Sequence, residues 1–234
     1  MIRCAMFDFG QVLVRFETQR FYDFLRAHMP NPDILKRRPI FTIEPMVDFD
    51  LGRIDTTRMF ERIKSELALN VGIAEFLFHF TEVMNPDPKM ATLRQILKVN
   101  GVKTAVVSNI NIYHFQYVQL VYPYVFANFD YPMLSYQHGF EKPDHRMWEI
   151  PARHLGVSPE ECFFVDDFKS NLVEFMKWSG GLGTGHHYDV VDEKYCPNGR
   201  LEEERKKLFL KMFDLNMLTF DQLIKLTFEK NESP

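Results

Sequence analysis

The sequence contains few cysteines. Only three occur in 234 residues, Cys4, Cys162 and Cys196, and no two of them have the Cys-x-x-Cys spacing of thiolate metal sites and redox motifs. Neither a disulfide framework nor a thiolate zinc site is therefore expected. This pattern of cysteine use is typical of proteins in a reducing compartment, and we expect the chain to be cytoplasmic.

An excess of basic residues is absent as well. The chain has 28 Lys and Arg against 32 Asp and Glu, which gives a net charge of -4. Nucleic acid is not an expected partner, because binding to it needs an accumulated positive field. No apolar run approaches the roughly 20 residues that cross a bilayer, and the N-terminus lacks the basic and apolar segments of a signal peptide. Neither a membrane partner nor secretion is expected.

The residues that are abundant are those of a packed core. Hydrophobic residues make up 46% of the sequence, and 23 of them are Phe. The length of 234 residues fits one core domain with a modest insertion, since single domains usually run to about 100–200 residues.

Short apolar runs alternate with stretches that have the apolar spacing of helices. The runs cover residues 3–9, 103–108, 127–134 and 161–166. Strands that alternate with helices form parallel sheets, so the expected fold class is α/β, a doubly wound parallel sheet with helices on both faces.

The alternation stops between residues 16 and 88. Helical patterns over residues 18–28, 56–69 and 72–84 predict a small inserted helical cap, and the Asn85-Pro86-Asp87-Pro88 segment predicts a loop back to the core. The predicted division is a core of residues 1–15 and 89–200, a cap of residues 16–88 and a C-terminal helical extension of residues 201–234. Within the extension, helices are predicted over residues 201–213 and 220–230.

Polar side chains stand where the predicted strands end. Asp8 ends the first run, Ser108 the second, and the Asp166-Asp167 pair the last. In open parallel sheets, ligands bind outside the carboxyl ends of the strands, so these groups are expected to converge on one site. Two adjacent carboxylates repel each other unless a cation or hydrogen bonds compensate, and the pair therefore favours a metal.

Four segments in this order resemble the motifs of haloacid dehalogenase-like hydrolases. They are Met6-Phe7-Asp8-Phe9-Gly10-Gln11-Val12-Leu13, Val106-Val107-Ser108-Asn109, Glu141-Lys142-Pro143-Asp144, and Phe164-Val165-Asp166-Asp167 through Asn171. Each motif alone is weak, but four in order are highly specific, and the resemblance covers residues 2–183. The Ser108 to Asn111 string and the small cap are most similar to phosphatases of the glucose-1-phosphatase type, which belong to subfamily IA.

The resemblance implies a Mg²⁺-dependent phosphatase that acts on a small phosphorylated metabolite, with a sugar phosphate favoured, through an aspartyl-phosphate on Asp8. Mg²⁺ prefers oxygen ligands, and the predicted metal group is Asp8, the Gly10 carbonyl, Asp166 and Asp167, with Asp166 orienting the others. Lys142 is predicted to neutralise the nucleophile and the transferring phosphoryl group. The remaining predictions are that Ser108, Asn109 and Lys142 hold the phosphate and that Asn171 supports the acidic pair by hydrogen bonding.

Gly10 departs from the pattern of the family's phosphatases, which commonly have a second Asp, the general acid and base, at this position. Glycine transfers no proton, and acid–base catalysis typically contributes about 10²–10⁴-fold in rate. Two alternatives therefore stay open. One is a haloacid dehalogenase-type hydrolase, which also uses an aspartate nucleophile without this second Asp. The other is a catalytically weak or inactive domain of the same family that serves as a binding protein.

One further acidic pattern lies in the predicted cap. Asp48, Asp50 and Gly52 faintly resemble a calcium loop, but the glycine falls one position early and the terminal Glu is absent. A turn in the cap is the favoured interpretation.

Overall fold

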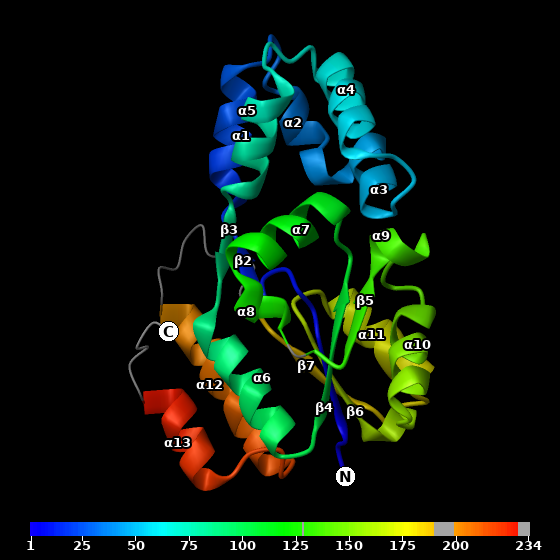
Figure 1. Cartoon of the computed structure of the whole chain (residues 1–234), viewed down its shortest axis with the longest axis vertical. Coiled ribbons are helices and arrows are strands. Elements are labelled where there is room, and N and C mark those ends of the chain that lie inside the picture. The colour runs from blue at the N-terminus through cyan, green and yellow to red at the C-terminus, as the bar shows by residue number, and fades with distance from the viewer. Residues whose placement is uncertain (128, 190–198, 229–234) are drawn as a thin grey trace.

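A parallel sheet forms the centre of the chain in the computed structural model, which describes residues 1–127, 129–189 and 199–228 (Figure 1). Its strand order is β5-β4-β1-β6-β7, and every neighbouring pair is parallel. The strands are β1 (Cys4–Phe7), β4 (Lys103–Ser108), β5 (Tyr131–Leu134), β6 (Cys162–Asp166) and β7 (Thr184–His187). The predicted parallel sheet is confirmed. The edge strand β7 was not among the predicted runs, because its sequence, Thr-Gly-His-His, is not apolar.

Side chains of the strands alternate between two apolar layers. In β1, Ala5 and Phe7 join one cluster, and Cys4 and Met6 join the other. Helices α10 (Arg146–Leu155) and α11 (Lys169–Trp178) cover the Met6 face, and α6 (Pro88–Val99) and α7 (Ile112–Val121) belong to the opposite layer. Helices on both faces make this a doubly wound α/β fold, as predicted.

A group of helices stands over the carboxyl ends of the strands (Figure 1). We call them the cap helices: α1 (Thr18–Ala27), α2 (Ile34–Arg37), α3 (Glu44–Asp50), α4 (Thr56–Leu67) and α5 (Ile73–Thr81), with a 3₁₀ turn, η1 (Ile40–Thr42), before α3. Much of the Phe content packs here. Phe21 is fully buried, and its ring centroid lies 5.4 Å from those of Phe76 and Phe80.

Two short antiparallel strands join the cap helices to the core. They are β2 (Val14–Phe16) and β3 (Met84–Pro86), and Met84 pairs with Phe16. The predicted helix over residues 72–84 was too long, because its last turn is replaced by this pairing. The predicted loop at residues 85–88 was also partly wrong: Asn85 and Pro86 belong to β3, and Asp87 caps α6 by accepting a hydrogen bond from the Lys89 amide. Helices α2 and α3 were not predicted. The domain boundaries at residues 16 and 88 stay predictions.

The C-terminal helices pack on the core of the same chain. They are α12 (Gly199–Asp214) and α13 (Phe220–Phe228), and Leu208 and Met212 are buried in the main apolar cluster. The side-chain Nδ2 of Asn100, after α6, donates to the Met217 carbonyl and to Gln222 Oε1. The predicted extension is thus helical where it is described. Residues 190–198 of the predicted core and 229–234 of the extension lie outside the described residues.

The remaining elements are short. They are α8 (Pro123–Phe126), α9 (Ser135–His138) and the 3₁₀ turn η2 (Pro159–Glu161). Across the described part of the chain, no helix combines the length and the apolar character needed to span a bilayer.

Candidate active site

Asp8, Asp166 and Asp167 meet at the carboxyl ends of two neighbouring strands. Asp8 follows β1, and its amide donates to the Val165 carbonyl of β6 at 2.9 Å. Asp166 ends β6, and Asp167 follows it. All three are buried, and each has a carboxylate oxygen within 4.8 Å of the others. The three acids therefore meet, as expected from the strand ends.

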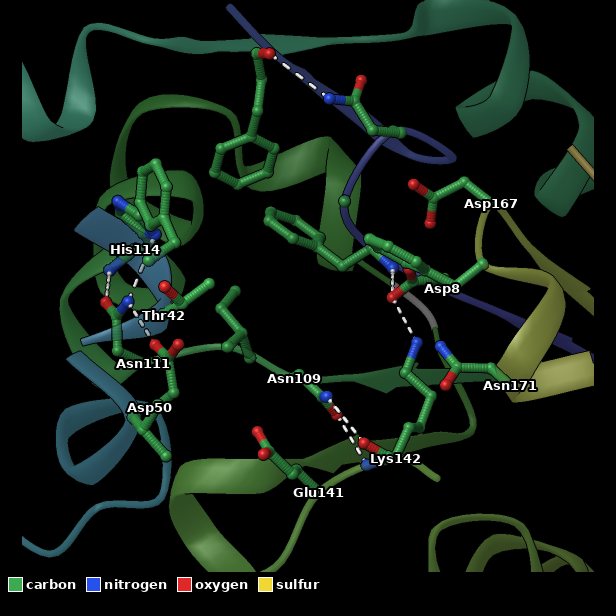
Figure 2. A pocket seen from close by; sticks show the side chains of 18 of the residues that line it. Asp8, Thr42, Asp50, Asn109, Asn111, His114, Glu141, Lys142, Asp167 and Asn171 are labelled. Carbon is green, nitrogen blue, oxygen red and sulfur yellow. Dashed lines mark hydrogen bonds and ion pairs between the residues drawn. The ribbon is translucent and has the colours of Figure 1, made fainter. Parts of the chain in front are cut away.

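The Lys142 ammonium neutralises two of these acids. Its Nζ lies 2.7 Å from Asp8 Oδ1 and 2.7 Å from Asp166 Oδ2, and its side chain is only 1% exposed. Burial disfavours the charged amine, but the two carboxylates outweigh burial and raise the pKa of Lys142 above its ordinary value. Lys142 is thus a fixed positive charge at the nucleophile predicted from the sequence (Figure 2).

Two amide side chains hold this ion cluster in place. Asn109 accepts a hydrogen bond from the Lys142 amide at 2.8 Å and donates to the Lys142 carbonyl at 3.1 Å. Asn171 donates to both oxygens of Asp166, at 3.0 and 3.1 Å, and the Phe168 amide donates to Oδ1 of the same carboxylate at 2.7 Å. Both Asp166 oxygens are therefore engaged within the protein, which suits an orienting role.

Among the described residues, hydrogen bonds and ion pairs leave part of the Asp8 and Asp167 carboxylates open. The two contacts of Asp8, from Lys142 and from the Phe9 amide at 2.6 Å, both go to Oδ1. Asp167 Oδ1 is buried without a hydrogen-bond partner. A buried carboxylate oxygen without a donor is costly, and a cation removes that cost.

Two acids of this cluster, Asp8 and Asp167, have raised pKa values. Burial raises the pKa of Asp8 to about 6, against the opposing effect of Lys142. Burial, and then the charges of Asp8 and Asp166, raise the pKa of Asp167 to about 8. Three acids face one ammonium here. A divalent cation held by Asp8 and Asp167 fits this donor set, because Mg²⁺ takes one or two carboxylates and keeps several waters.

Three other predicted residues have less direct contact with the acid cluster: Gly10, Ser108 and Asn109. Gly10 lines the cavity over Asp8, and a Cβ built on it would approach no atom more closely than 3.8 Å, at the Phe16 ring. Ser108 is buried at the end of β4 and is not among the described residues that line this cavity. Asn109 does line it, but its side chain is bonded to the backbone of Lys142. The phosphate-binding roles of Ser108 and Asn109 stay predictions.

The cavity has a volume of about 550 Å³ and extends from Asp8 and Lys142 to the cap helices. Figure 2 shows Asp50, Asn111 and His114 grouped on the other side of it from Asp8. Asn111 Nδ2 donates to Asp50 Oδ1 at 2.9 Å, and Asn111 Oδ1 accepts from the His114 amide at 2.8 Å. His114 Nε2 lies 3.1 Å from the Phe80 carbonyl of α5. None of these three residues was predicted from the sequence to belong to the site.

The acids Asp48 and Asp50, which faintly resemble part of a calcium loop, point to different partners in the structure. Asp48 pairs instead with Arg53 and Arg62, at 3.2 and 2.8 Å. Asp50 ends α3, its carbonyl accepts from the Ser135 hydroxyl at 2.6 Å, and its carboxylate faces the cavity. Only the packing of α3 against the core reveals this, since no sequence pattern marks a lone acid at a helix end.

Residues 2–172 match the family model described as haloacid dehalogenase-like hydrolase. The chain belongs to this hydrolase family, and the family resemblance inferred from the four motifs is confirmed.

Two curated relatives are similar to the chain. The sesquiterpene phosphatase astK of Aspergillus oryzae is 27% identical over 172 residues, which cover 73% of this chain and 83% of that protein. Acyl-CoA dehydrogenase family member 10 of mouse is 28% identical over 181 residues. Those residues make up 73% of this chain but only 16% of that much longer protein.

Solved structures share the fold. The family enzyme bt-2542 of Bacteroides thetaiotaomicron, in complex with magnesium and inorganic phosphate, has a TM-score of 0.66 at 19% identity and covers 80% of this chain and 94% of its own. The L-2-haloacid dehalogenase of Xanthobacter autotrophicus, with chloropropionic acid covalently bound, has a TM-score of 0.58 at 15% identity and covers 99% of this chain and 91% of its own. At these identities the likeness concerns the fold alone.

Proposed function

We propose that the chain is a Mg²⁺-dependent phosphatase that cleaves a phosphate monoester through a phosphoryl group carried on Asp8. The observation that carries the proposal is the buried cluster in which Lys142 contacts Asp8 and Asp166 while Asp167 Oδ1 has no partner. A nucleophilic carboxylate needs positive charge on both sides to approach a phosphate dianion. Lys142 supplies one such charge, and the open oxygens of Asp8 and Asp167 offer a place for another.

In this mechanism the Asp8 carboxylate, beside Lys142, attacks phosphorus through one of its oxygens. The bond between phosphorus and the ester oxygen breaks, and the leaving oxygen takes a proton from water in the cavity, since Gly10 has no side chain to donate one. Water then attacks phosphorus, releases inorganic phosphate and restores the Asp8 carboxylate. Asp8 and Asp167 would hold Mg²⁺, which supplies charge stabilisation to the phosphoryl oxygens. Lys142 keeps its position beside Asp8 throughout.

The proposed class of substrate is supported by the proteins to which the chain is similar. A phosphatase among the curated relatives and a neighbour complexed with magnesium and phosphate support a phosphate ester and Mg²⁺. The resemblance to glucose-1-phosphatase-type enzymes favours a sugar phosphate, whereas the A. oryzae relative is a sesquiterpene phosphatase. Both kinds of ester belong in the test.

The test is a panel of sugar and isoprenoid phosphates, together with p-nitrophenyl phosphate, assayed for phosphate release with and without Mg²⁺. We expect turnover that requires Mg²⁺ and is lost in Asp8→Asn. Asp23→Asn, on an exposed acid of α1, is the matched control and should keep the activity. Chloride release from 2-chloropropionate without Mg²⁺, and no phosphate release from any ester, would establish the dehalogenase alternative instead.

A further inference from the structure

Asp50 presents a carboxylate to the cavity, whose described lining includes one Lys and no Arg. Asn111 Nδ2 donates to Asp50 Oδ1 at 2.9 Å. Burial raises the pKa of Asp50 to about 7, Asn111 opposes this, and the charge of Glu141 adds to it. A carboxylate in such a place gains most from a hydrogen-bond donor that a ligand brings.

The rest of the cavity adds negative charge. Asp8, Glu141 and Asp167 also line it, and Lys142 is the only Lys or Arg among the described residues that do so. Lys142 is already paired with Asp8 and Asp166. The phosphate of a substrate would meet Lys142 and the metal. A second anionic group farther along the substrate would meet the acids Asp50 and Glu141, which repel it when they are ionised.

Apolar side chains also line the cavity, beside the polar Gln11, Thr18 and Thr42. Phe9 and Phe16 come from the first core loop and β2, Ile110 follows β4, and Phe41 and Val47 come from the cap helices and η1. Such walls bury an apolar group well, whereas hydroxyls placed against them lose their hydrogen bonds to water. A sugar with hydroxyls on every carbon would place some of them against these apolar side chains, whereas a molecule with one polar end would not.

We propose that Asp50 determines specificity, and that the substrate is a phosphate monoester whose organic group is apolar along its length, has no second anion and ends in a hydroxyl or amine that donates to Asp50. This inference rests on the proposed phosphatase activity. It assigns Asp50 to substrate recognition and leaves the chemistry to Asp8.

The experiment uses linear alkyl phosphates of equal chain length that end in methyl, hydroxyl, amine or carboxylate, over a series of lengths. We expect the wild-type kcat/KM at the best length to be at least roughly tenfold higher for the hydroxyl or amine ester than for the carboxylate ester, a difference of about 1.4 kcal/mol. Asp50→Asn keeps the size of the side chain and an acceptor for Asn111 but removes the charge. In this variant the preference in kcat/KM for the hydroxyl or amine ester over the carboxylate ester should fall severalfold, mainly through changes in KM.

Glu44→Gln is the matched control. It makes the same change of charge on α3, but Glu44 is 77% exposed at its side chain and does not line the cavity. This variant should keep the wild-type ratio. Binding of the same four esters to Asp8→Asn with Mg²⁺, measured by calorimetry, gives the preference without turnover.

The outcomes separate the two proposals. If p-nitrophenyl phosphate is hydrolysed but the carboxylate ester is used or bound as well as the hydroxyl and amine esters, the inference is wrong and the phosphatase stands. An unchanged ratio in Asp50→Asn would equally overturn it. If no phosphate ester, p-nitrophenyl phosphate included, is bound or hydrolysed, the proposed function itself fails and takes this inference with it.

Discussion

The Nζ of Lys142 lies 2.7 Å from Oδ1 of Asp8, and both side chains are buried. Because Lys142 also contacts Asp166, its removal leaves three buried acids with no counter-charge. We expect Lys142→Met to lower the free energy of unfolding by about 3–5 kcal/mol at neutral pH and to abolish phosphatase activity. Chemical denaturation and phosphate release measure the two effects.

The destabilisation by Lys142→Met should shrink as the pH falls, because protonated acids no longer need the ammonium. Lys177→Met is the control, since Lys177 forms an exposed pair with Glu174 and should cost less than about 1 kcal/mol. A Lys142→Met protein as stable as the wild type at neutral pH would show that the ion cluster does not need this charge.

Gly10 marks the position of the absent general acid, and the structure has room for one. A Cβ there would lie 3.8 Å from the Phe16 ring, and the backbone at Gly10 is not in the left-handed region. We expect Gly10→Asp to raise kcat for alkyl phosphates by about tenfold or more, since acid–base catalysis contributes about 10²–10⁴-fold. The gain should be smaller for p-nitrophenyl phosphate, whose leaving group needs no proton.

Gly10→Asn is the matched control for that gain, because it has the same shape and transfers no proton. Equal rates for the Asp and Asn variants would mean that proton transfer to the leaving group does not limit the enzyme.

Mg²⁺ should stabilise the protein more at high pH than at low pH. The raised pKa values of Asp8, about 6, and Asp167, about 8, mean that the folded chain holds protons which a metal must displace. Without metal, these two acids make stability fall as the pH rises from their ordinary pKa of 3.8 to about 6 for Asp8 and about 8 for Asp167, because the unfolded chain releases its protons more easily. Melting temperatures with and without Mg²⁺ at pH values below and above this window measure the effect.

Asp167→Asn tests which residue carries that response to Mg²⁺. The substitution keeps the size of the side chain but removes the charge, so the rise in melting temperature with Mg²⁺ should largely disappear. An undiminished rise would place the cation elsewhere.

His114 should make the protein sensitive to acid. Burial lowers its pKa to about 4 from an ordinary value of 6.5, although the hydrogen bond to the Phe80 carbonyl opposes this. Since the unfolded chain takes up the proton first, stability is lost as the pH falls from about 6.5 to about 4, by on the order of 3 kcal/mol for this group. Unfolding free energies at both ends of that range should differ less in His114→Gln than in the wild type.

His145→Gln, at a side chain that is 64% exposed, is the control for His114 and should follow the wild type. If the unfolding free energy of His114→Gln fell with pH as steeply as that of the wild type, His114 would not be a buried neutral imidazole. His186, whose pKa burial also lowers to about 4, adds to the slope in both proteins and does not affect the comparison.

The sequence was sufficient for the parts of the site that stand at strand ends. Asp8, Asp166 and Asp167 were predictable because apolar runs stop at them, and parallel topology brings such ends together. Lys142 came from the family resemblance alone, since it lies in a loop with no periodic pattern. Its distance to Asp8 is set by Asn109, whose hydrogen bonds to the Lys142 backbone no sequence pattern reveals.

The far side of the cavity was not predictable, because it depends on how two separately patterned segments pack. Asp50 comes from α3, which is short, and its neighbour Asn111 lies 61 residues away in the sequence. The cap helices approach the core closely at Gly52. A Cβ on Gly52 would lie 2.1 Å from the Tyr136 carbonyl oxygen, so only glycine fits at this position. Gly52 can be read from the sequence, but its contact with the Tyr136 carbonyl cannot be predicted from it.

The account depends most on Asp8 as the residue that carries the phosphoryl group. The direct measurement is rapid acid quenching of the enzyme during turnover of a phosphate ester with Mg²⁺, followed by mass spectrometry of its peptides. We predict the mass gain of one phosphoryl group on Asp8, absent in Asp8→Asn and without Mg²⁺. Phosphorylation of another residue, or an Asp8→Asn protein with undiminished turnover, would contradict the account.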